Sequence, residues 1–459
     1  MRTVIHNATI VNEGKCFVGY VVVEDEFIVD VRKCPESRVQ EFRSSISAEI
    51  QKADKVIDAK GLYLMPGVID DHVHFREPGL TQKGDISTES RSAAAGGVTS
   101  YMDMPNTVPA TTTLKLLEDK FQLAEEKSLV NYSFFFGGTK KNIELLKRLD
   151  PHKVCGVKVY MDNDSLGKKP AKQDKTLRAI MEQSPVLVMV HCEDRNTIKQ
   201  NIKLLMKRYK GQNDFPVRYH SRICNADACF NATLRAVMVA KETGARLHVA
   251  QVSSEKELWL FQNTPLAGKR ITAEACIANL MFCTEDYDWL GTRIKTDPAV
   301  KSSEDREALR KGITFGLIDV VSSDHAPHLL SDKVGGALTA ASGMPLIQVA
   351  LVSMLELCDK GVLPIEKVVE LMCHNPAIIY KIDRRGYIRK GYYADLVLLD
   401  PEAYWQVRGE KYYAKCGWSP MDEHTFKWRV RRTMVNGKTV FEDGEIVEDV
   451  RGMSLEFGG

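Results

Sequence analysis

Residues 64–74, LMPGVIDDHVH, form a mostly apolar run that ends in two histidines separated by one residue. A strand buried on both faces has this nearly continuous apolar pattern. Comparable runs recur further along the chain, and helix-compatible segments such as 111–128, TTTLKLLEDKFQLAEEKS, follow them. With 64–74 the strand candidates number eight, and the others are 97–105, 131–138, 155–161, 185–193, 245–254, 270–276 and 317–328.

This alternation of strands and helices predicts an α/β protein. Eight strand-then-helix units favour a closed (β/α) eight-stranded TIM-like barrel, in which functional residues lie at the C-terminal ends of the strands. A doubly wound open sheet is the alternative, because it is built from the same units.

Both ends of the chain have a different pattern. Short Val/Ile runs alternate with turn residues in 3–32, and similar runs return in 391–400 and 429–447, where Asn436-Gly437 is typical of a hairpin turn. Chain ends often lie close together. We therefore expect a small β-sandwich domain formed by both termini, residues 1–63 plus 386–459, beside a barrel of residues 64–385.

Composition narrows the range of partners. Lys and Arg number 63 against 61 Asp and Glu, so the charge gives no reason to expect nucleic acid or an acidic membrane surface. We find neither a signal-peptide pattern nor an apolar stretch long enough to cross a bilayer. The 11 Cys have no paired spacing, which suits a reducing compartment. We expect a cytoplasmic protein that binds a small-molecule substrate.

The two histidines that end the first run are candidate metal ligands. Side chains alternate along a strand, so His72 and His74 project to the same side and can hold one cation. Lys158 interrupts a second apolar run, where an unpaired ammonium is costly to bury. Its neutral amine could react with carbon dioxide to give an anionic carbamate, or it could reach water at a frayed strand end.

Further polar residues follow later strands. His191 ends the run PVLVMVH, and Asp324 and His328 lie at the end of the last strand candidate, after DVVSS. Each of them could be a satisfied structural residue when taken singly. Because the C-terminal ends of barrel strands meet at one face, we expect these side chains to converge there.

With these residues in view, the chain resembles the cyclic amidohydrolases, and within them the dihydroorotases most closely. The motifs that carry the resemblance run from the N-terminal strands to about Gly437. They are PGVIDDHVHFREPG, AGGVTSYMDMPNT, GVKVYM, VHCED and SDHAPH. The resemblance implies a metal-dependent hydrolase barrel with a binuclear zinc centre that reversibly hydrolyses the ring amide of dihydroorotate.

The resemblance also implies a role for each matching residue. His72, His74 and Asp324 would hold one zinc ion, and a carbamate on Lys158 would bridge it to a second ion held by His191. Asp324 would also move the proton from the attacking water to the leaving nitrogen. The substrate-binding residues would be Arg76 and Asn106, which would hold the substrate carboxylate, and His328.

The clearest departure from the family pattern is at the sixth strand. Relatives carry a metal-binding histidine where this chain has Gln251, and an amide oxygen is a poor zinc ligand beside imidazole. His248 lies three residues earlier, so it faces the other side of a regular strand. The number of zinc ions, one or two per chain, therefore stays open.

Other departures lie on the substrate side. Asp297 replaces an asparagine, which could place a carboxylate near an anionic substrate. Ala278-Asn279 stands where relatives have two histidines, and Gly343-Met344 where a Gly-Gly pair is usual.

Three functions remain open from the sequence. The first is a dihydroorotase of pyrimidine biosynthesis, favoured by Arg76 and Asn106. The second is a related hydrolase of a hydantoin, dihydropyrimidine or allantoin, favoured by Asp297. The third is a catalytically impaired scaffold homologue, favoured by Gln251. The resemblance further implies a homodimer and association with an aspartate carbamoyltransferase.

Overall fold

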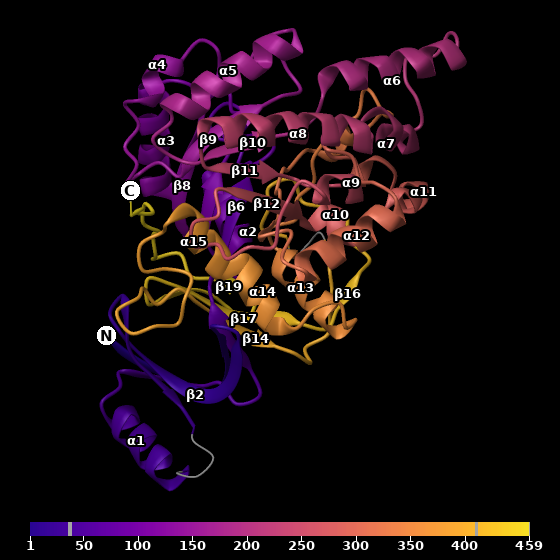
Figure 1. Cartoon of the computed structure of the whole chain (residues 1–459). Coiled ribbons are helices and arrows are strands. Elements are labelled where there is room, and N and C mark those ends of the chain that lie inside the picture. Colours follow the sequence, from indigo (N-terminus) through magenta and orange to yellow (C-terminus); the bar gives the residue numbers. More distant parts are fainter. Residues whose placement is uncertain (35–38, 409–411, 459) are drawn as a thin grey trace.

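The computed structural model of the chain describes residues 1–34, 39–408 and 412–458 (Figure 1). Most of the strands in these residues belong to two large sheets. Figure 1 shows the barrel and its helices in the upper part of the molecule, with β2 and α1 below. No helix in the described part of the chain is long and apolar enough to cross a membrane.

The first sheet is the predicted barrel. Its eight strands pair in chain order, and each neighbouring pair is parallel. A parallel bridge between Val73 and His325, with His74 N donating to His325 O at 2.7 Å, joins the last strand to the first. The strands are β6 (Val68–Val73), β7 (Val98–Asp103), β8 (Asn131–Gly137), β9 (Gly156–Tyr160), β10 (Val188–His191), β11 (Leu247–Ala250), β12 (Ile271–Cys276) and β13 (Val320–Ser322).

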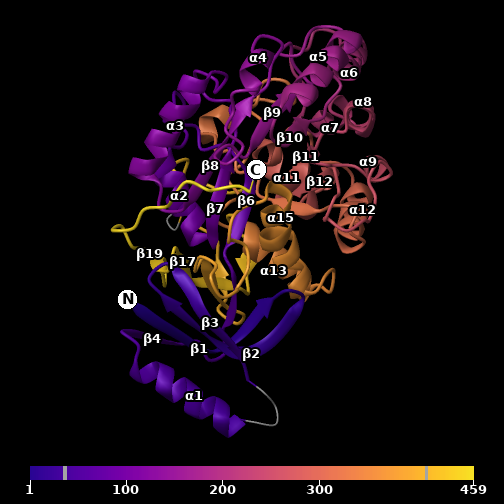
Figure 2. The ribbon, with the colours of Figure 1, turned by 60° about the vertical axis from the view of Figure 1, so that its left-hand side comes forward.

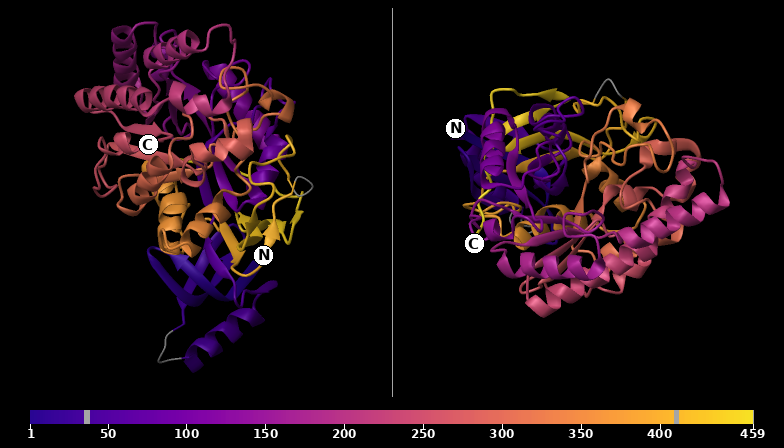
Figure 3. Two further views of the ribbon diagram at one scale, coloured as in Figure 1. Left: turned by 90° about the vertical axis from the view of Figure 1, so that its right-hand side faces the viewer. Right: turned by 90° about the horizontal axis from the view of Figure 1, so that it is seen from above.

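Helices follow these strands on the outside of the barrel, and Figure 3 shows them along its outer edge when seen from above. Local sequence fixes several of their ends: Asp85 and Thr88 form a capping box at the start of α2, and Thr113 caps α3. The longer helices around the barrel are α2 (Ile86–Ala95), α3 (Leu114–Lys127), α5 (Pro170–Gln183), α6 (Arg195–Arg208), α8 (Ala226–Thr243), α12 (Ser303–Thr314) and α13 (Ala350–Asp359). The shorter ones are α4 (Ile143–Leu146), α7 (His220–Ile223), α9 (Glu255–Leu258), α10 (Ile277–Met281), α11 (Tyr287–Leu290), α14 (Ile365–Val369) and α15 (Asn375–Tyr380).

The second sheet combines strands from both ends of the chain. Its order is β19-β18-β17-β14-β5-β1-β2-β3, with β4 paired to β1. Its strands are β1 (Arg2–Asn12), β2 (Lys15–Glu24), β3 (Phe27–Lys33), β4 (Lys55–Asp58), β5 (Tyr63–Pro66), β14 (Leu396–Asp400), β17 (Arg429–Val435), β18 (Lys438–Glu442) and β19 (Glu445–Ile446). β15 (Trp405–Gln406) and β16 (Thr425–Phe426) form a separate pair. The predicted Asn436-Gly437 turn joins β17 to β18, and both residues have positive φ, as a tight hairpin requires.

The helix α1 (Val39–Gln51) covers part of this sheet, as Figure 2 shows. Ile46 packs in one apolar cluster with Val4, Tyr20 and Val22 of β1 and β2. The barrel and the terminal sheet together confirm the predicted fold class. The exact boundaries between the two predicted domains stay a prediction.

The opening run 64–74 is not one strand. Pro66 ends β5 in the terminal sheet, and Val68 begins β6 in the barrel. Gly67 lies between them, where a Cβ would come within 2.1 Å of Thr99 Oγ1. The run is therefore the covalent link between the two sheets, and its second half carries the two histidines to the end of a barrel strand.

Candidate active site

A cavity of about 180 Å³ lies where the barrel strands end. Nine residues singled out in the sequence line it, namely His72, His74, Arg76, Asn106, His191, Gln251, Asp297, Asp324 and Gly343. Its remaining lining residues are Tyr160, Asp162, Thr296, Ala326 and Ser342. The other residues singled out in the sequence do not line it, namely Lys158, His248, His328, Ala278, Asn279 and Met344.

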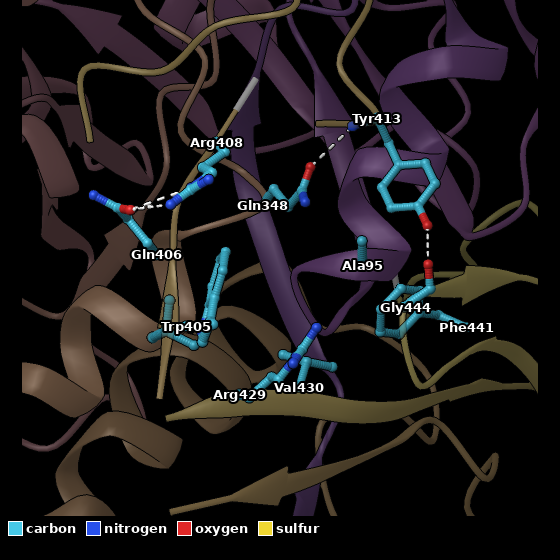
Figure 4. A pocket seen from close by; sticks show the side chains of 11 residues that line it. Ala95, Gln348, Trp405, Gln406, Arg408, Tyr413, Arg429, Val430, Phe441 and Gly444 are labelled. Atoms are coloured by element: carbon cyan, nitrogen blue, oxygen red, sulfur yellow. Dashed lines mark hydrogen bonds between the residues drawn. The ribbon is translucent and has the colours of Figure 1, made fainter. Parts of the chain in front are cut away.

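A second cavity, of about 360 Å³, lies between the barrel and the terminal sheet (Figure 4). Figure 4 shows Trp405, Tyr413 and two arginines, Arg408 and Arg429, around it. None of its lining residues is a histidine, cysteine, aspartate or glutamate, the side chains that hold transition metals in proteins. The smaller cavity is therefore the candidate active site.

Three side chains at this cavity form a group suited to a metal ion. His72 Nε2 lies 3.5 Å from Asp324 Oδ1, and His74 Nε2 lies 3.4 Å from the same oxygen. Ligands about 2.0–2.1 Å from a tetrahedral ion are separated by distances of this size. Two imidazoles and a carboxylate are also a common zinc donor set. The residues thus fit one ion.

The other ring nitrogens of both histidines have acceptors. His72 Nδ1 lies 2.8 Å from Glu274 Oε1, and His74 Nδ1 lies 2.7 Å from Asn106 Oδ1. An Nδ1–H that donates to these oxygens leaves each Nε2 free to bind a metal. Burial also lowers the pKa of His74 to about 4, so its ring is neutral near pH 7.

Unusual backbone conformations occur at the cavity. Arg76, Gln251 and Asp324 have φ angles of 67°, 57° and 47°, values that residues other than glycine rarely adopt. Backbone strain of this kind often occurs at functional sites, where the surrounding structure holds it in place. Three such residues around one cavity support its assignment as a functional site.

Lys158 lies in β9 and is almost fully buried. Its Nζ lies 3.4 Å from Met189 Sδ and 5.5 Å from the centre of the Tyr160 ring. Within the described part of the chain no carboxylate forms an ion pair with it. Burial lowers its pKa, which favours the uncharged amine that carbamylation requires.

His191, the predicted ligand of a second ion, has a hydrogen-bond acceptor near each ring nitrogen. Gln251 Oε1 lies 2.7 Å from Nδ1, and Glu193 Oε2 lies 3.2 Å from Nε2. Burial opposes a charge on the ring, but Glu193 and the charge of Asp162 outweigh it and raise the pKa of His191 to about 9. A ring held by two acceptors in this way offers no free nitrogen to a metal.

Gln251 connects this histidine to Asp324. Its Nε2 donates to Asp324 Oδ2 at 2.8 Å and to Asp297 O at 2.9 Å, while its Oε1 faces His191. The amide therefore stands in a hydrogen-bonded chain at the position where the resemblance implies a metal-binding imidazole. The residues present do not fit a second ion beside the first.

Arg76 is fixed by a backbone carbonyl and by His328. Its Nε donates to Pro327 O at 3.0 Å, and its Nη2 lies 3.1 Å from His328 Nε2. Lys83 Nζ lies 3.0 Å from the other ring nitrogen of His328. Burial and these two cations lower the pKa of His328 to about 3. His328 thus supports Arg76 from behind the cavity, while the remaining guanidinium donors stay available to a ligand.

Asp297 places a carboxylate at the cavity, as its sequence position suggested. Its Oδ1 lies 2.8 Å from His220 Nε2. Burial opposes its ionisation, but the hydrogen bond and charge of His220 outweigh this and hold the pKa of Asp297 well below its usual range. The cavity therefore has a guanidinium and a negative carboxylate among its lining residues.

Sequence reasoning missed Glu274, Asp162 and Glu193. Glu274 lies in β12, is fully buried, and accepts from His72 and from Gln251 N at 3.2 Å. Glu274 is a charged residue inside the apolar run RITAEAC, just as Lys158 is in its own apolar run. Glu274 could therefore have been predicted from the sequence. Asp162 and Glu193 follow strand ends, and no feature of their surroundings in the sequence distinguishes them.

The chain is similar in sequence to a known family and to several known proteins. The profile of the Amidohydrolase family matches residues 63–440. A dihydroorotase of Methanosarcina mazei is 33% identical over 81% of this chain and 82% of its own length. A dihydroorotase of Halobacterium salinarum is 32% identical over 95% of this chain and 98% of its own length, and an allantoinase of Bacillus velezensis is 30% identical over 86% and 88%.

A solved structure is also similar to this chain in its fold. An L-hydantoinase (dihydropyrimidinase) from Arthrobacter aurescens superposes with a TM-score of 0.86 at 27% identity, covering 97% of both chains. The relatives thus share the fold but carry names that refer to different ring substrates. The match over most of the length, with the histidines and aspartate gathered at the end of the barrel strands, shows that the chain belongs to the Amidohydrolase family.

Proposed function

We propose that the chain is a dihydroorotase, which reversibly hydrolyses the ring amide of dihydroorotate to N-carbamoyl-L-aspartate. The observation that carries this proposal is the position of Arg76 and Asn106, which line the same cavity as His72, His74 and Asp324. A ring amide with a carboxylate substituent suits a cavity that has both a metal donor set and a guanidinium. The related dihydroorotases support this choice.

The chain would hold one zinc ion through His72, His74 and Asp324, with a carbamate on Lys158 as a further ligand. When bound, such an ion supplies Lewis-acid chemistry and lowers the pKa of water. We propose no second ion, because Gln251 is hydrogen-bonded to both His191 and Asp324.

The residues around the ion would bind the substrate and move the proton. Arg76 would bind the substrate carboxylate through the guanidinium donors that Pro327 O and His328 leave free. Asn106 would donate its amide to the same carboxylate, while its Oδ1 keeps His74 in the correct orientation. Asp324 would accept the proton of the attacking water and deliver it to the leaving ring nitrogen. Burial opposes its ionisation, but His72, His74 and Gln251 outweigh this and lower its pKa, so it is a carboxylate at neutral pH.

This activity would place the chain in pyrimidine biosynthesis in the cytoplasm. A homodimer and association with an aspartate carbamoyltransferase belong to the same proposal. They rest on the dihydroorotase assignment, since the enzyme that forms carbamoyl aspartate supplies its product to this reaction.

One observation favours a second candidate, an uncharged ring amide such as allantoin or a hydantoin. Asp297 faces the cavity as a negative carboxylate, and a neutral ring would avoid repulsion from it. The related allantoinase and the hydantoinase structure are consistent with this alternative.

The test is hydrolysis by purified protein supplied with zinc and bicarbonate, on dihydroorotate, allantoin, hydantoin and dihydrouracil. We expect ring opening of dihydroorotate above that of the others. His74→Ala is the control that removes a metal donor, and Arg76→Met removes the carboxylate clamp. Equal loss of all activities in His74→Ala, but loss of dihydroorotate turnover alone in Arg76→Met, would support the proposal. Turnover of only the uncharged rings would favour the second candidate, and no turnover of any ring would favour a scaffold.

A further inference from the structure

A second group of metal-ligand side chains lies inside the barrel, outside the cavity described above. It consists of Asp71, His248 and Glu274, from β6, β11 and β12, and all three are fully buried. His248 Nε2 lies 3.4 Å from Asp71 Oδ2 and 3.7 Å from Glu274 Oε2. None of these residues lines the candidate active-site cavity.

Several polar atoms of this group lack hydrogen-bond partners within the described part of the chain. They are Asp71 Oδ1, His248 Nε2 and Glu274 Oε2. A buried polar atom without a partner costs about 1–3 kcal/mol, so native proteins rarely leave one. Here three are left within one group, and all belong to ligand types that bind divalent ions.

The orientation of His248 is fixed from its other side. Its Nδ1 lies 2.7 Å from Thr272 Oγ1, and that hydroxyl donates to Leu247 O at 3.3 Å. Thr272 Oγ1 must therefore accept the proton of Nδ1. Nε2 then faces two carboxylates, so either a proton on Nε2 or a metal cation lies between them. Tyr380 OH donates to Asp71 Oδ2 at 2.9 Å and holds this carboxylate in the same way. Supporting hydrogen bonds of this kind orient metal ligands.

The separations also favour a metal ion over a shared proton. Charge-assisted N–H···O bonds are about 2.7–2.9 Å long, shorter than the separations of His248 from Asp71 and Glu274. By contrast, 3.4 Å is the same as the separation of His74 from Asp324 in the predicted zinc group. We propose that Asp71, His248 and Glu274 form a structural site for a divalent transition-metal ion such as zinc, inside the barrel and distinct from the catalytic group.

Glu274 links this inner site to the active site. Its Oε2 faces His248, whereas its Oε1 accepts from His72 Nδ1 at 2.8 Å. An ion at the inner site holds β6, β11 and β12 together and keeps Glu274 ionised beneath His72. The inner ion is thus a positioning element for the catalytic histidine, and its presence does not depend on which ring the chain hydrolyses.

The test compares metal content per chain, measured by mass spectrometry after expression in zinc-supplied cells and dialysis against metal-free buffer. His74→Ala disrupts the catalytic group without touching the inner one. We expect His74→Ala to hold one more ion per chain than His74→Ala/His248→Gln, with both variants folded by circular dichroism. Equal metal content in the two variants overturns the proposal.

A milder variant covers the case in which His248→Gln does not fold. Thr272→Val keeps all three ligands but removes the acceptor of His248 Nδ1, so affinity for the inner ion should fall about 10–100-fold. Zinc retained by His74→Ala and by His74→Ala/Thr272→Val is then titrated with a chelator to equilibrium. An unchanged chelator midpoint overturns the proposal. Since these readouts count ions and not turnover, failure to hydrolyse dihydroorotate would contradict only the proposed function.

Discussion

Replacing Gln251 by histidine should convert the site from one metal ion to two. In the wild-type chain Gln251 Nε2 donates to Asp324 Oδ2 at 2.8 Å and to Asp297 O at 2.9 Å. A hydrogen bond to a charged group contributes about 1.5–3 kcal/mol and one to a neutral carbonyl about 0.5–1.5 kcal/mol. Without metal, Gln251→His should therefore lower the free energy of unfolding by about 2–4.5 kcal/mol.

Added zinc should reverse this loss in the variant. The new imidazole would give His191 a partner ligand, and an ion present at 100 times its dissociation constant stabilises the fold by about 2.7 kcal/mol. The variant should also hydrolyse dihydroorotate faster, because Asp324 Oδ2 would no longer accept from an amide and would become a better base.

The assay is metal content per chain together with thermal unfolding, with and without chelator. Gln251→Leu is the matched control, since it removes the same hydrogen bonds without adding a ligand; it should lose stability and gain no ion. The reasoning is refuted if wild-type protein already holds an ion that His191→Ala removes, or if Gln251→His binds no more zinc than Gln251→Leu.

Three further changes test other parts of the site and fold. Arg76→Lys replaces a planar fork by a point charge and should raise KM for dihydroorotate about 10–100-fold with a smaller change in kcat; an unchanged KM would exclude Arg76 as the carboxylate clamp. Asp297→Asn removes a negative charge from the cavity and should lower KM for anionic dihydroorotate without changing that for hydantoin, so an equal effect on both would contradict the electrostatic argument. Burial opposes ionisation of Asp214, but hydrogen bonds from Thr339, Leu338 N and other backbone amides outweigh it and lower its pKa to about 2. Because the folded pKa lies below the unfolded one, Asp214→Asn should unfold at lower temperature than wild type above pH 4, and the gap should close as pH falls towards 2.

Much of the fold could be predicted from the sequence because each barrel strand is a short apolar run followed by a helix. β8, for example, is buried at every position, which is the environment that a continuous apolar run requires. The split of 64–74 into β5 and β6 could not be predicted in this way. Both halves are apolar, and the reason for the break is the close approach of Thr99 to Gly67, a contact distant in sequence.

The candidate active site, too, could be predicted from the sequence only in part. His72, His74 and Asp324 could be placed together because strand ends converge on one face of a barrel. The structure places Nε2 of each histidine 3.4–3.5 Å from Asp324 Oδ1. The partners of Gln251 could not be foreseen, because they depend on its left-handed backbone and side-chain rotamer. Chemical type showed that Gln251 was a weak ligand, but only the geometry shows that it joins His191 to Asp324.

The two departures from the family pattern, Gln251 and Asp297, are linked by a hydrogen bond. Gln251 Nε2 donates both to the backbone oxygen of Asp297 and to Asp324 Oδ2, so the residue that replaces a ligand also holds the segment carrying the unusual carboxylate. Substitutions of residues in direct contact change the free energy by amounts that do not simply add. Gln251→His alone would release the Asp297 segment, and Asp297→Asn alone would leave Asp324 bonded to an amide. We therefore expect the double variant to exceed the sum of the single variants in dihydroorotate turnover, whereas additive effects would mean that the two departures act independently.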